Sequence, residues 1–202
     1  MKAFHIVGPA PLCTNTFLLV SDAGHAVAID PAADASLYEQ ALEQTGATLT
    51  HIFCTHGHYD HVGAVKQLKE KWGCKVYMDS ADAQGNRSLP MEPADVDCGY
   101  TDGGEIQVDE LTFKTWHTPG HTPGSWVILC NDMFFTGDTL FHGSIGRTDL
   151  PGGSMAQMEE SLQKLLELPV ADNARVLPGH EALSTMAEEK RHNYYLREFM
   201  EE

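Results

Sequence analysis

The sequence predicts an α/β protein in which two β-sheets pack together and helices lie outside them. Short runs rich in β-branched and aromatic residues recur along the chain and are separated by turn residues, which indicates strands in antiparallel meanders. Segments with apolar residues at helical spacing interrupt these meanders. Because 42% of the 202 residues are hydrophobic, the chain can bury a substantial core, and we expect one domain over residues 1–202.

The first part of the chain predicts strands that alternate with two helices. Asp34 or Ser36 can cap the first helix, and Gly46 closes it. The second helix begins after His61 and stops at Gly73. The predicted strands are Asn15–Val20, His25–Ile29, Leu49–Cys54 and Cys74–Met78.

The second part predicts a longer meander. Residues 79–104 are rich in Asp, Gly and Pro without clear periodicity, which favours a mobile loop or a flap. A Gly-rich connection over residues 137–153 leads to a helix over Met155–Leu168, and a polar helix is predicted from about Met186 to Met200. The predicted strands are Glu105–Val108, Leu111–Trp116, Trp126–Cys130, Met133–Thr136 and Arg175–Leu177.

The charge balance restricts the partners. Thirteen basic and 29 acidic residues give a net charge of −16, which argues against nucleic acid and anionic membranes and favours a small-molecule substrate. No apolar stretch approaches the roughly 20 residues of a membrane span, and the N-terminus lacks the features of a signal peptide. The five cysteines form no C-x-x-C pair and are interpreted as reduced thiols. We therefore expect a soluble, cytoplasmic protein, and the sequence leaves its oligomeric state open.

The run Thr55–His61 concentrates potential metal ligands. Its three histidines and one aspartate suit zinc, iron and manganese, and a composition-based estimate places such a string in roughly two chains per thousand. His56 and His58 share a face only in an extended segment or a loop. The spacing therefore favours a loop that supplies two adjacent metal positions. Cys54 could add a ligand, but Ile52 and Phe53 beside it favour a strand interior.

Three later segments repeat one design, in which a strand end and a Gly-containing turn precede a potential ligand. The ligands are His121, Asp138 and His180. Loops at strand ends can converge on one edge of a sheet scaffold. A single histidine after Pro-Gly is more often a turn residue, so the strength of the signal comes from the whole set.

These segments together resemble the metallo-β-lactamase superfamily, and the glyoxalase II (hydroxyacylglutathione hydrolase) group in particular. The resemblance covers roughly residues 12–197 and implies an αββα sandwich of two mixed sheets with the site at one edge. With only 22 residues after His180, the chain is similar to a short bacterial subgroup that lacks the C-terminal helical domain. The matching segments are Thr55–His61, Thr118–Ser125, Phe135–Phe141, Gly143–Gly153, Pro178–His180 and Glu188–Leu196, where relatives often have Pro in place of Tyr194.

The resemblance also implies a ligand set. His56, His58 and His121 would hold one divalent metal ion, whereas Asp60, His61 and His180 would hold a second, and Asp138 would bridge both. Zinc is the favoured metal, and iron or manganese also fits these ligands. Tyr59 and Arg147 are candidates for substrate contact, with a structural Arg147–Asp149 pair as the favoured alternative for Arg147.

The implied activity is hydrolysis of a thioester, S-D-lactoylglutathione or a related hydroxyacylglutathione, by a hydroxide that bridges the metals, as in methylglyoxal detoxification. Asp138 and Asp60 are the candidate catalytic carboxylates, which would orient the nucleophile or accept its proton. One alternative is a persulfide dioxygenase with a single iron on His56, His121 and Asp138. Its usual Cys-Gly-Arg-Thr-Asp-Phe pattern is Ile-Gly-Arg-Thr-Asp-Leu here, which favours the hydrolase. A lactone or other ester hydrolase is a further alternative.

Residues around the ligands have predicted supporting roles. Asp30 either receives a ligand imidazole N–H or is a turn residue before Pro31. Thr55 and Thr122 are expected to hydrogen-bond to nearby loop backbone, and His117 to make a structural hydrogen bond.

Overall fold

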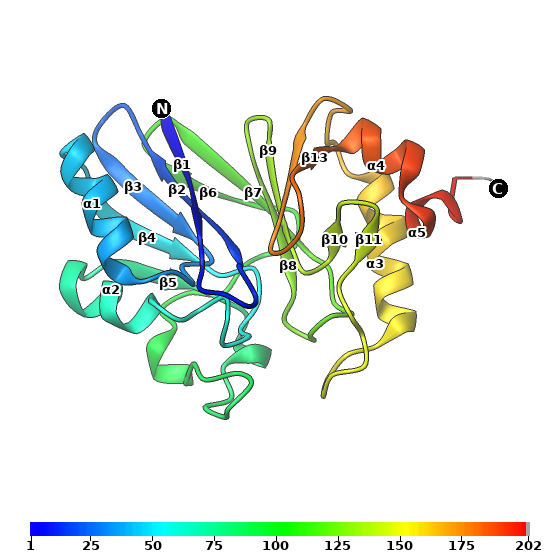
Figure 1. The fold of residues 1–202 in the computed structure, drawn as a ribbon, viewed down its shortest axis with the longest axis horizontal. Helices are drawn as coiled ribbons and strands as arrows, with labels where there is room; N and C mark the ends of the chain where they lie inside the picture. Colours follow the sequence, from blue (N-terminus) through cyan, green and yellow to red (C-terminus); the bar gives the residue numbers. More distant parts are fainter. Residues whose placement is uncertain (201–202) are drawn as a thin grey trace.

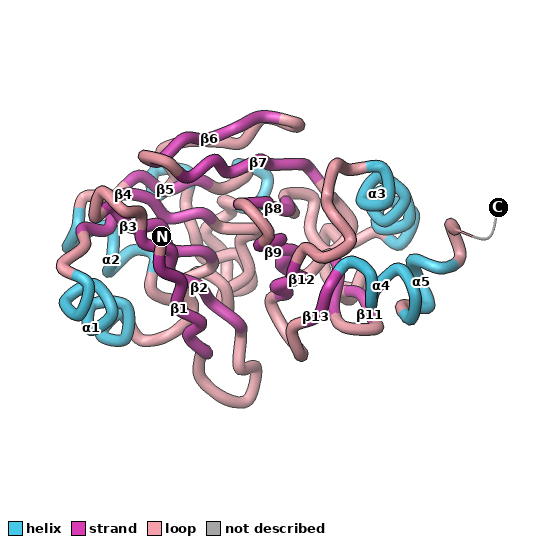
Figure 2. The backbone as a smooth tube through the Cα atoms, turned by 90° about the horizontal axis from the view of Figure 1, so that it is seen from above, coloured by secondary structure: helices cyan, strands magenta, loops and turns pink. Residues whose placement is uncertain are grey.

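The computed structural model describes residues 1–200 and consists of two central β-sheets with helices on both outer faces (Figure 1). Helices α1 (Ala35–Thr45) and α2 (Val65–Trp72) cover the sheet of the N-terminal half. Helices α3 (Met155–Glu167), α4 (Met186–His192) and α5 (Tyr194–Arg197) lie against the other sheet, at the opposite end of the molecule (Figure 2). This arrangement confirms the αββα sandwich.

The first sheet has the strand order β1-β2-β3-β4-β5. Strands β1 to β3 pair antiparallel, whereas β3, β4 and β5 pair parallel, so the sheet is mixed. All of β2 is buried, whereas the edge strand β1 is largely exposed. The strands are β1 (Lys2–Val7), β2 (Asn15–Val20), β3 (His25–Ile29), β4 (Thr48–Phe53) and β5 (Lys75–Tyr77).

The second sheet has the order β13-β12-β9-β8-β7-β6 and is also mixed, because only β12 and β9 pair in parallel. Strands β10 (Leu140–Phe141) and β11 (Ser144–Ile145) form a separate hairpin within the Gly-rich connection. The strands of the sheet are β6 (Gly104–Val108), β7 (Leu111–His117), β8 (Trp126–Cys130), β9 (Met133–Gly137), β12 (Arg175–Pro178) and β13 (Ser184–Thr185).

Aromatic pairs join the two sheets. The rings of Phe17 and Phe135 lie 5.2 Å apart between centroids, and those of Phe53 and Phe113 lie 4.9 Å apart. All four side chains belong to the buried cluster between the sheets. Because aromatic side chains bury large apolar areas, these pairs contribute strongly to the docking of the two sheets.

The predicted caps of the helices are confirmed. The Asp34 side chain accepts the Ser36 N–H at 2.9 Å at the start of α1, which identifies Asp34 as the cap rather than Ser36. Gly46 and Gly73 follow α1 and α2 in left-handed conformation, which glycine adopts without a Cβ clash. Among residues 1–200, no helix combines the length and the apolar character that crossing a membrane requires.

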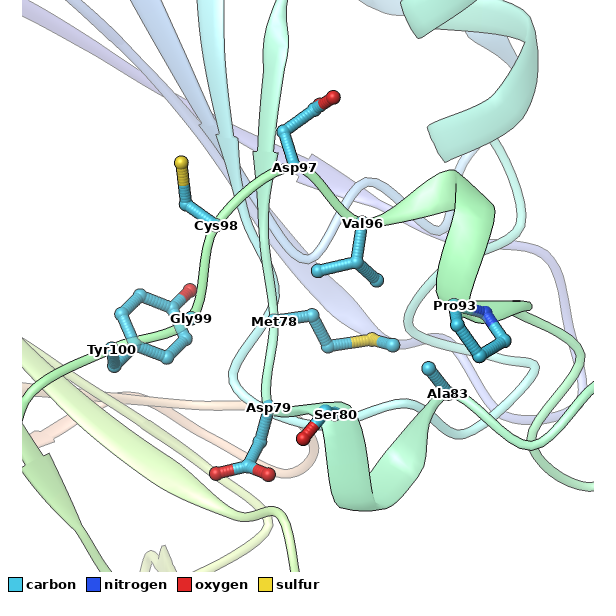
Figure 3. A pocket seen from close by; sticks show the side chains of 10 residues that line it. All are labelled: Met78, Asp79, Ser80, Ala83, Pro93, Val96, Asp97, Cys98, Gly99 and Tyr100. Atoms are coloured by element: carbon cyan, nitrogen blue, oxygen red, sulfur yellow. The ribbon is translucent and has the colours of Figure 1, made fainter.

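Two predictions about irregular segments agree with the structure only in part. Residues 79–104 are largely irregular, as predicted, but they are not without structure. They contain the short 3₁₀ helices η1 (Ser80–Asp82) and η2 (Pro93–Asp95), and Leu89 and Met91 are buried. Figure 3 shows Met78, Ala83 and Val96 facing a common pocket of about 320 Å³ at this segment. Apolar burial, which the weak periodicity concealed, holds the segment in place.

The polar C-terminal helix is likewise not continuous. Asn193 separates α4 from α5 with extended backbone (φ −72°, ψ 116°). Its side-chain amide donates to the carbonyls of Phe141 and Ser144 at 3.2 and 2.9 Å. These hydrogen bonds, which attach the β10–β11 hairpin to the helices, replace helix continuation at this position.

Strand direction brings the ligand-bearing loops together. Strand β7 is antiparallel to β8 and β8 to β9, so β7, β9 and β12 run in the same direction. The segments containing His121, Asp138 and His180 follow the carboxyl ends of these three strands, and the run Thr55–His61 follows the carboxyl end of β4. The edge where these ends meet is therefore the natural position for a site.

Candidate metal centre

A buried carboxylate fixes the start of the ligand run. Asp30 follows β3 in left-handed conformation (φ +46°) and accepts the backbone N–H and the hydroxyl of Thr55, each at 2.6 Å. The other Asp30 contact is with His61 Nδ1, at 3.0 Å. Of the two interpretations of Asp30, the structure therefore supports the acceptor of a ligand imidazole N–H.

One group of potential ligands consists of His56, His58 and His121. All three side chains are buried, and one nitrogen of each lies within 4.8 Å of the other two. The shortest separation, 2.9 Å, joins His58 Nδ1 to His121 Nε2. The structure thus brings together the three residues assigned to the first metal.

A second group consists of Asp60, His61 and His180, again with ligand atoms within 4.8 Å of one another. His180 Nε2 lies 3.2 Å from Asp60 Oδ2 and 3.4 Å from His61 Nε2. These are the three residues assigned to the second metal.

Asp138 lies between the two groups. Its Oδ1 is 3.3 Å from His61 Nε2, and its Oδ2 is 3.3 Å from His121 Nε2 and 3.6 Å from His180 Nε2. Asp138 Oδ2 is thus near His121 of the first group and His180 of the second. A carboxylate that bridges two metal ions requires this placement. The structure therefore assembles all seven residues of the predicted set.

Hydrogen bonds at Nδ1 assign the tautomers of four of these histidines. The Nδ1–H of His61 donates to Asp30, that of His121 to the Arg147 carbonyl at 2.7 Å, and that of His180 to the Leu12 carbonyl at 3.2 Å. Thr55 donates its own hydroxyl hydrogen to Asp30, so it accepts from His56 Nδ1 at 3.2 Å. Each of these rings, when neutral, therefore presents a lone pair at Nε2.

These lone pairs fit a divalent cation. His56 Nε2 and Asp138 Oδ1 are buried, and neither has a hydrogen-bond partner among the described residues. Buried polar atoms seldom lack a partner, and each one needs an explanation. Imidazole nitrogens and carboxylate oxygens that converge in this way are a suitable ligand set for a divalent metal.

The electrostatics agree with this donor set. Burial lowers the pKa of His56 well below its usual range and, with His121 nearby, lowers the pKa of His58 to about 4. Burial alone would raise the pKa of Asp138, but His61 and His121 outweigh it and hold that pKa low. Burial opposes protonation of His61, yet Asp138 and Asp30 raise its pKa well above the usual range. A proton and a metal ion therefore compete for the Nε2 of His61.

The ligand groups open into a pocket of about 620 Å³. Leu12 and Phe141 line it on apolar walls, and Tyr59, whose side chain is 55% exposed, stands at its mouth. Arg147 also lines the pocket, while its guanidinium binds Asp149 at 2.7 and 2.8 Å. Both candidate substrate residues thus border the pocket, and the predicted Arg147–Asp149 pair is present.

The remaining predictions have mixed outcomes. His117 makes a structural hydrogen bond from Nε2 to the Pro123 carbonyl at 2.8 Å, as expected. Cys54 is a fully buried core residue and belongs to none of the ligand groups. The prediction for the two threonines is wrong: the Thr55 hydroxyl donates to Asp30 and the Thr122 hydroxyl to Asp82, at 2.7 Å, rather than to loop backbone. A buried carboxylate is a stronger acceptor than a carbonyl.

Sequence reasoning missed Asp82 and Asn193. Asp82 lies in the segment predicted to be a flap, and Asn193 lies in the segment predicted to be helical. The only sequence signal for Asn193 was its position in the tail Glu188–Leu196, which matches the family pattern.

The comparisons with known proteins agree with the site. The Metallo-beta-lactamase superfamily pattern matches residues 10–180. The Haemophilus influenzae protein named Hydroxyacylglutathione hydrolase GloC is 36% identical over 196 residues, which cover 90% of this chain and 92% of that protein.

Two solved structures extend the similarity to three dimensions. ETHE1 from Myxococcus xanthus has a TM-score of 0.84 at 32% identity, covering 100% of this chain and 89% of that one. TTHA1623, solved in a di-iron-bound form, has a TM-score of 0.78 at 33% identity, covering 95% of this chain and 99% of that one.

The sandwich of two mixed sheets, the converging His and Asp side chains and the match over residues 10–180 lead to one conclusion: this chain belongs to the metallo-β-lactamase superfamily of metallo-hydrolases and has hydroxyacylglutathione hydrolases among its relatives.

Proposed function

We propose that this protein is a metal-dependent thioester hydrolase that cleaves S-D-lactoylglutathione or a related hydroxyacylglutathione. The observation that carries the proposal is the placement of Asp138 within 3.3 Å of both His61 and His121, between two groups of potential ligands. This arrangement supports a centre with two divalent ions. Zinc is the proposed metal because it accepts nitrogen and oxygen ligands in tetrahedral sites, while the di-iron form of TTHA1623 makes iron the first alternative.

When bound, divalent metals lower the pKa of a coordinated water towards neutrality and polarise a carbonyl oxygen. The residues of this chain supply the rest. His56, His58 and His121 hold one position, and Asp60, His61 and His180 hold the other. Asp138, between them, accepts a hydrogen bond from the nucleophile and so aims its lone pair at the carbonyl carbon. The oxygen of the nucleophile forms a C–O bond to the carbonyl carbon, and as the C–S bond breaks its electron pair leaves with sulfur as a thiolate. The protons given up by the water and by the acid product go to the thiolate and to the solvent.

The pocket walls support a substrate of thioester size. Leu12, Phe141 and Tyr59 offer apolar contact for a carbon chain beside the reacting carbonyl. Arg147 is the sole basic side chain, apart from histidine, among the described residues that line this pocket, so it is the proposed contact for a carboxylate of the thiol carrier. Its pairing with Asp149 weakens that contact. The five free cysteines support a reducing, cytoplasmic location, and the net charge of −16 supports a small-molecule substrate over nucleic acid.

Steady-state hydrolysis by a metal-quantified sample tests the proposal. The panel contains S-D-lactoylglutathione, an acyl-coenzyme A with the same acyl group, and a lactone. We expect kcat/KM to be highest for the glutathione thioester. Preference for the lactone would support the ester-hydrolase alternative, and no hydrolysis of any thioester would contradict the proposal.

The similarity to ETHE1 favours one second candidate, persulfide dioxygenase activity with a single iron held by His56, His121 and Asp138. The Ile145-Gly146-Arg147 sequence of the pocket loop argues against it, because dioxygenases of this type have Cys at the first of these positions. Oxygen uptake with glutathione persulfide separates the two candidates. Oxygen consumption by a sample with one iron per chain would establish the dioxygenase.

A further inference from the structure

Asp82, at the end of η1, is a completely buried carboxylate whose two oxygens both accept hydrogen bonds. Oδ2 accepts the backbone N–H of Gly57 at 2.9 Å and the hydroxyl of Thr122 at 2.7 Å. Oδ1 accepts the backbone N–H of Gly124 at 3.1 Å. Asp82 thus joins two loops that lie 65 residues apart in the sequence (122 − 57).

The donors lie next to the ligands of only one metal group. Gly57 stands between His56 and His58, and Thr122 follows His121. These three histidines form the first group, and all of them adjoin a residue that Asp82 binds. None of the three donors is adjacent in sequence to Asp60, His61 or His180.

Close packing around Asp82 leaves no space for a side chain at two of its donor residues. A Cβ on Gly57 would come within 2.7 Å of the Asp82 Cβ, and a Cβ on Gly124 would come within 2.6 Å of the Asp82 Cγ. Contacts this short force something to shift, so the two loops approach Asp82 closely only because both residues are glycine. This accounts for one glycine in each of two ligand motifs.

The segment that carries Asp82 is itself fixed. The Asp79 side chain caps η1 by accepting the Ala81 N–H at 2.9 Å, and its other oxygen accepts the indole N–H of Trp126 at 2.8 Å. On the far side of the segment, Met78 and Ala83 face the pocket shown in Figure 3, away from the Asp79 carboxylate. Asp82 is therefore held between β8 and the core under α2 rather than on a free loop.

We propose that Asp82 is a positioning residue that sets the geometry of the His56, His58 and His121 metal position and not that of the other position. Its carboxylate accepts from both ligand loops at once and so fixes the separation of the three imidazoles. This inference rests on the proposed two-metal centre and is independent of the substrate.

Measurement of zinc binding to the whole protein tests the proposal. Competition with a chromophoric chelator gives one dissociation constant for each bound ion. Two reference variants, His121→Ala and His180→Ala, identify which constant belongs to which position. In Asp82→Asn, we expect zinc affinity to fall about 10- to 100-fold at the position that His121→Ala abolishes. The reason is that the introduced amide NH2 would face an N–H donor in place of an acceptor oxygen. The constant that His180→Ala removes should be unchanged.

Asp95→Asn is the matched control, since it makes the same charge change in the neighbouring helix η2, where the Asp95 carboxylate contacts Glu92 and Lys66 rather than a ligand loop. Equal weakening of both constants in Asp82→Asn, or the same pattern in Asp95→Asn, would overturn the proposal. A wild type that binds only the ion removed by His121→Ala would contradict the two-metal centre, while Asp82 would still be tested on that ion.

Thr122→Val keeps the test valid if Asp82→Asn does not fold, because it leaves Asp82 in place and removes one of its donors. It should weaken zinc binding at the same position in the same direction. A second comparison uses Asp82→Ala: Gly124→Ala should lower the melting temperature of the wild type much more than that of Asp82→Ala, in which the clashing Cγ is absent. If Gly124→Ala and Asp82→Ala lower the melting temperature additively, the two residues are not coupled, which would contradict the proposal.

Discussion

The Nε2 atoms of His61 and His180 face one another at 3.4 Å, although both rings donate their Nδ1 hydrogens elsewhere. Two neutral imidazoles in this arrangement present lone pairs to the same point. Such an arrangement is unfavourable unless a cation or a proton lies between the rings. It links the stability of the fold to the metal content of the site.

Metal removal should therefore destabilise the protein. At a free metal concentration about 1,000 times the dissociation constant, binding contributes about 4 kcal/mol, which a strong chelator would remove. The expected result is a lower melting temperature after chelation and dialysis, restored by zinc. Calcium, which prefers oxygen ligands, serves as the control and should not restore it. Equal melting temperatures with and without metal would contradict the proposed centre.

Asp138→Asn should abolish most activity without disturbing the fold. The amide keeps the size of the side chain but loses the charge that pairs with both ligand groups. We expect kcat/KM for the thioester to fall by about 10²- to 10³-fold, similar to the loss of one oriented stabilising group. Activity and bound metal should be measured on the same sample. Full hydrolysis by Asp138→Ala would show that the bridging role is wrong.

Asp30 should tolerate only one of two substitutions. Asn can accept the Thr55 and His61 contacts at least in part and adopts left-handed backbone readily, whereas Ala does neither at φ +46°. We expect about a 10- to 100-fold loss of metal affinity in Asp30→Ala and a smaller loss in Asp30→Asn. Chelator competition measures both. Equal losses in the two variants would mean that Asp30 acts only as a charge, and the opposite order would contradict its role as a hydrogen-bond acceptor.

Asn193→Ala should release the β10–β11 hairpin. The substitution leaves the carbonyls of Phe141 and Ser144 without their donor, at a cost of about 1–3 kcal/mol for each buried group that stays unsatisfied. Because Phe141 lines the substrate pocket, KM should rise while kcat changes little. Urea unfolding and steady-state kinetics measure the two effects, and Arg191→Ala, an exposed site on α4, is the control.

Arg147 and Asp149 allow a matched test of substrate charge. Arg147→Ala removes the cation at the pocket, whereas Asp149→Ala frees it from its partner. For a glutathione thioester we expect KM to rise in Arg147→Ala and to fall in Asp149→Ala. A neutral N-acetylcysteamine thioester should show neither change. Parallel changes in the two variants with both substrates would mean that the pair only shapes the loop.

The sequence predicted strands β2 to β9 and β12 but not β1 or the two-residue strands β10, β11 and β13, and it pointed to the seven converging residues because their signals are local. The run Thr55–His61 and the turns before His121, Asp138 and His180 lie within single short segments. Asp82 could not be found in this way. Its donors at Gly57 and Thr122 lie 25 and 40 residues away, and its own segment has no periodicity.

The break between α4 and α5 has the same origin. Helix propensity around Asn193 favours continuation, but its amide binds carbonyls 49 and 52 residues away. Tertiary hydrogen bonds of this kind override local preference and are absent from any window of the sequence. The partners of Thr55 and Thr122 were misjudged for the same reason, since both are distant carboxylates.

The aromatic pairs between the sheets also affect the position of the metal ligands. Phe53 lies three residues before His56, and Phe135 lies three residues before Asp138, so each ring is at the root of a ligand loop. The thickness of this aromatic layer therefore sets how far the ligands of the Thr55–His61 run, which follow the first sheet, lie from His121, Asp138 and His180, which follow the second. Because each proposed metal position takes ligands from both sheets, metal–nitrogen distances measured by X-ray absorption in Phe53→Leu or Phe135→Leu should report how closely the two sheets pack.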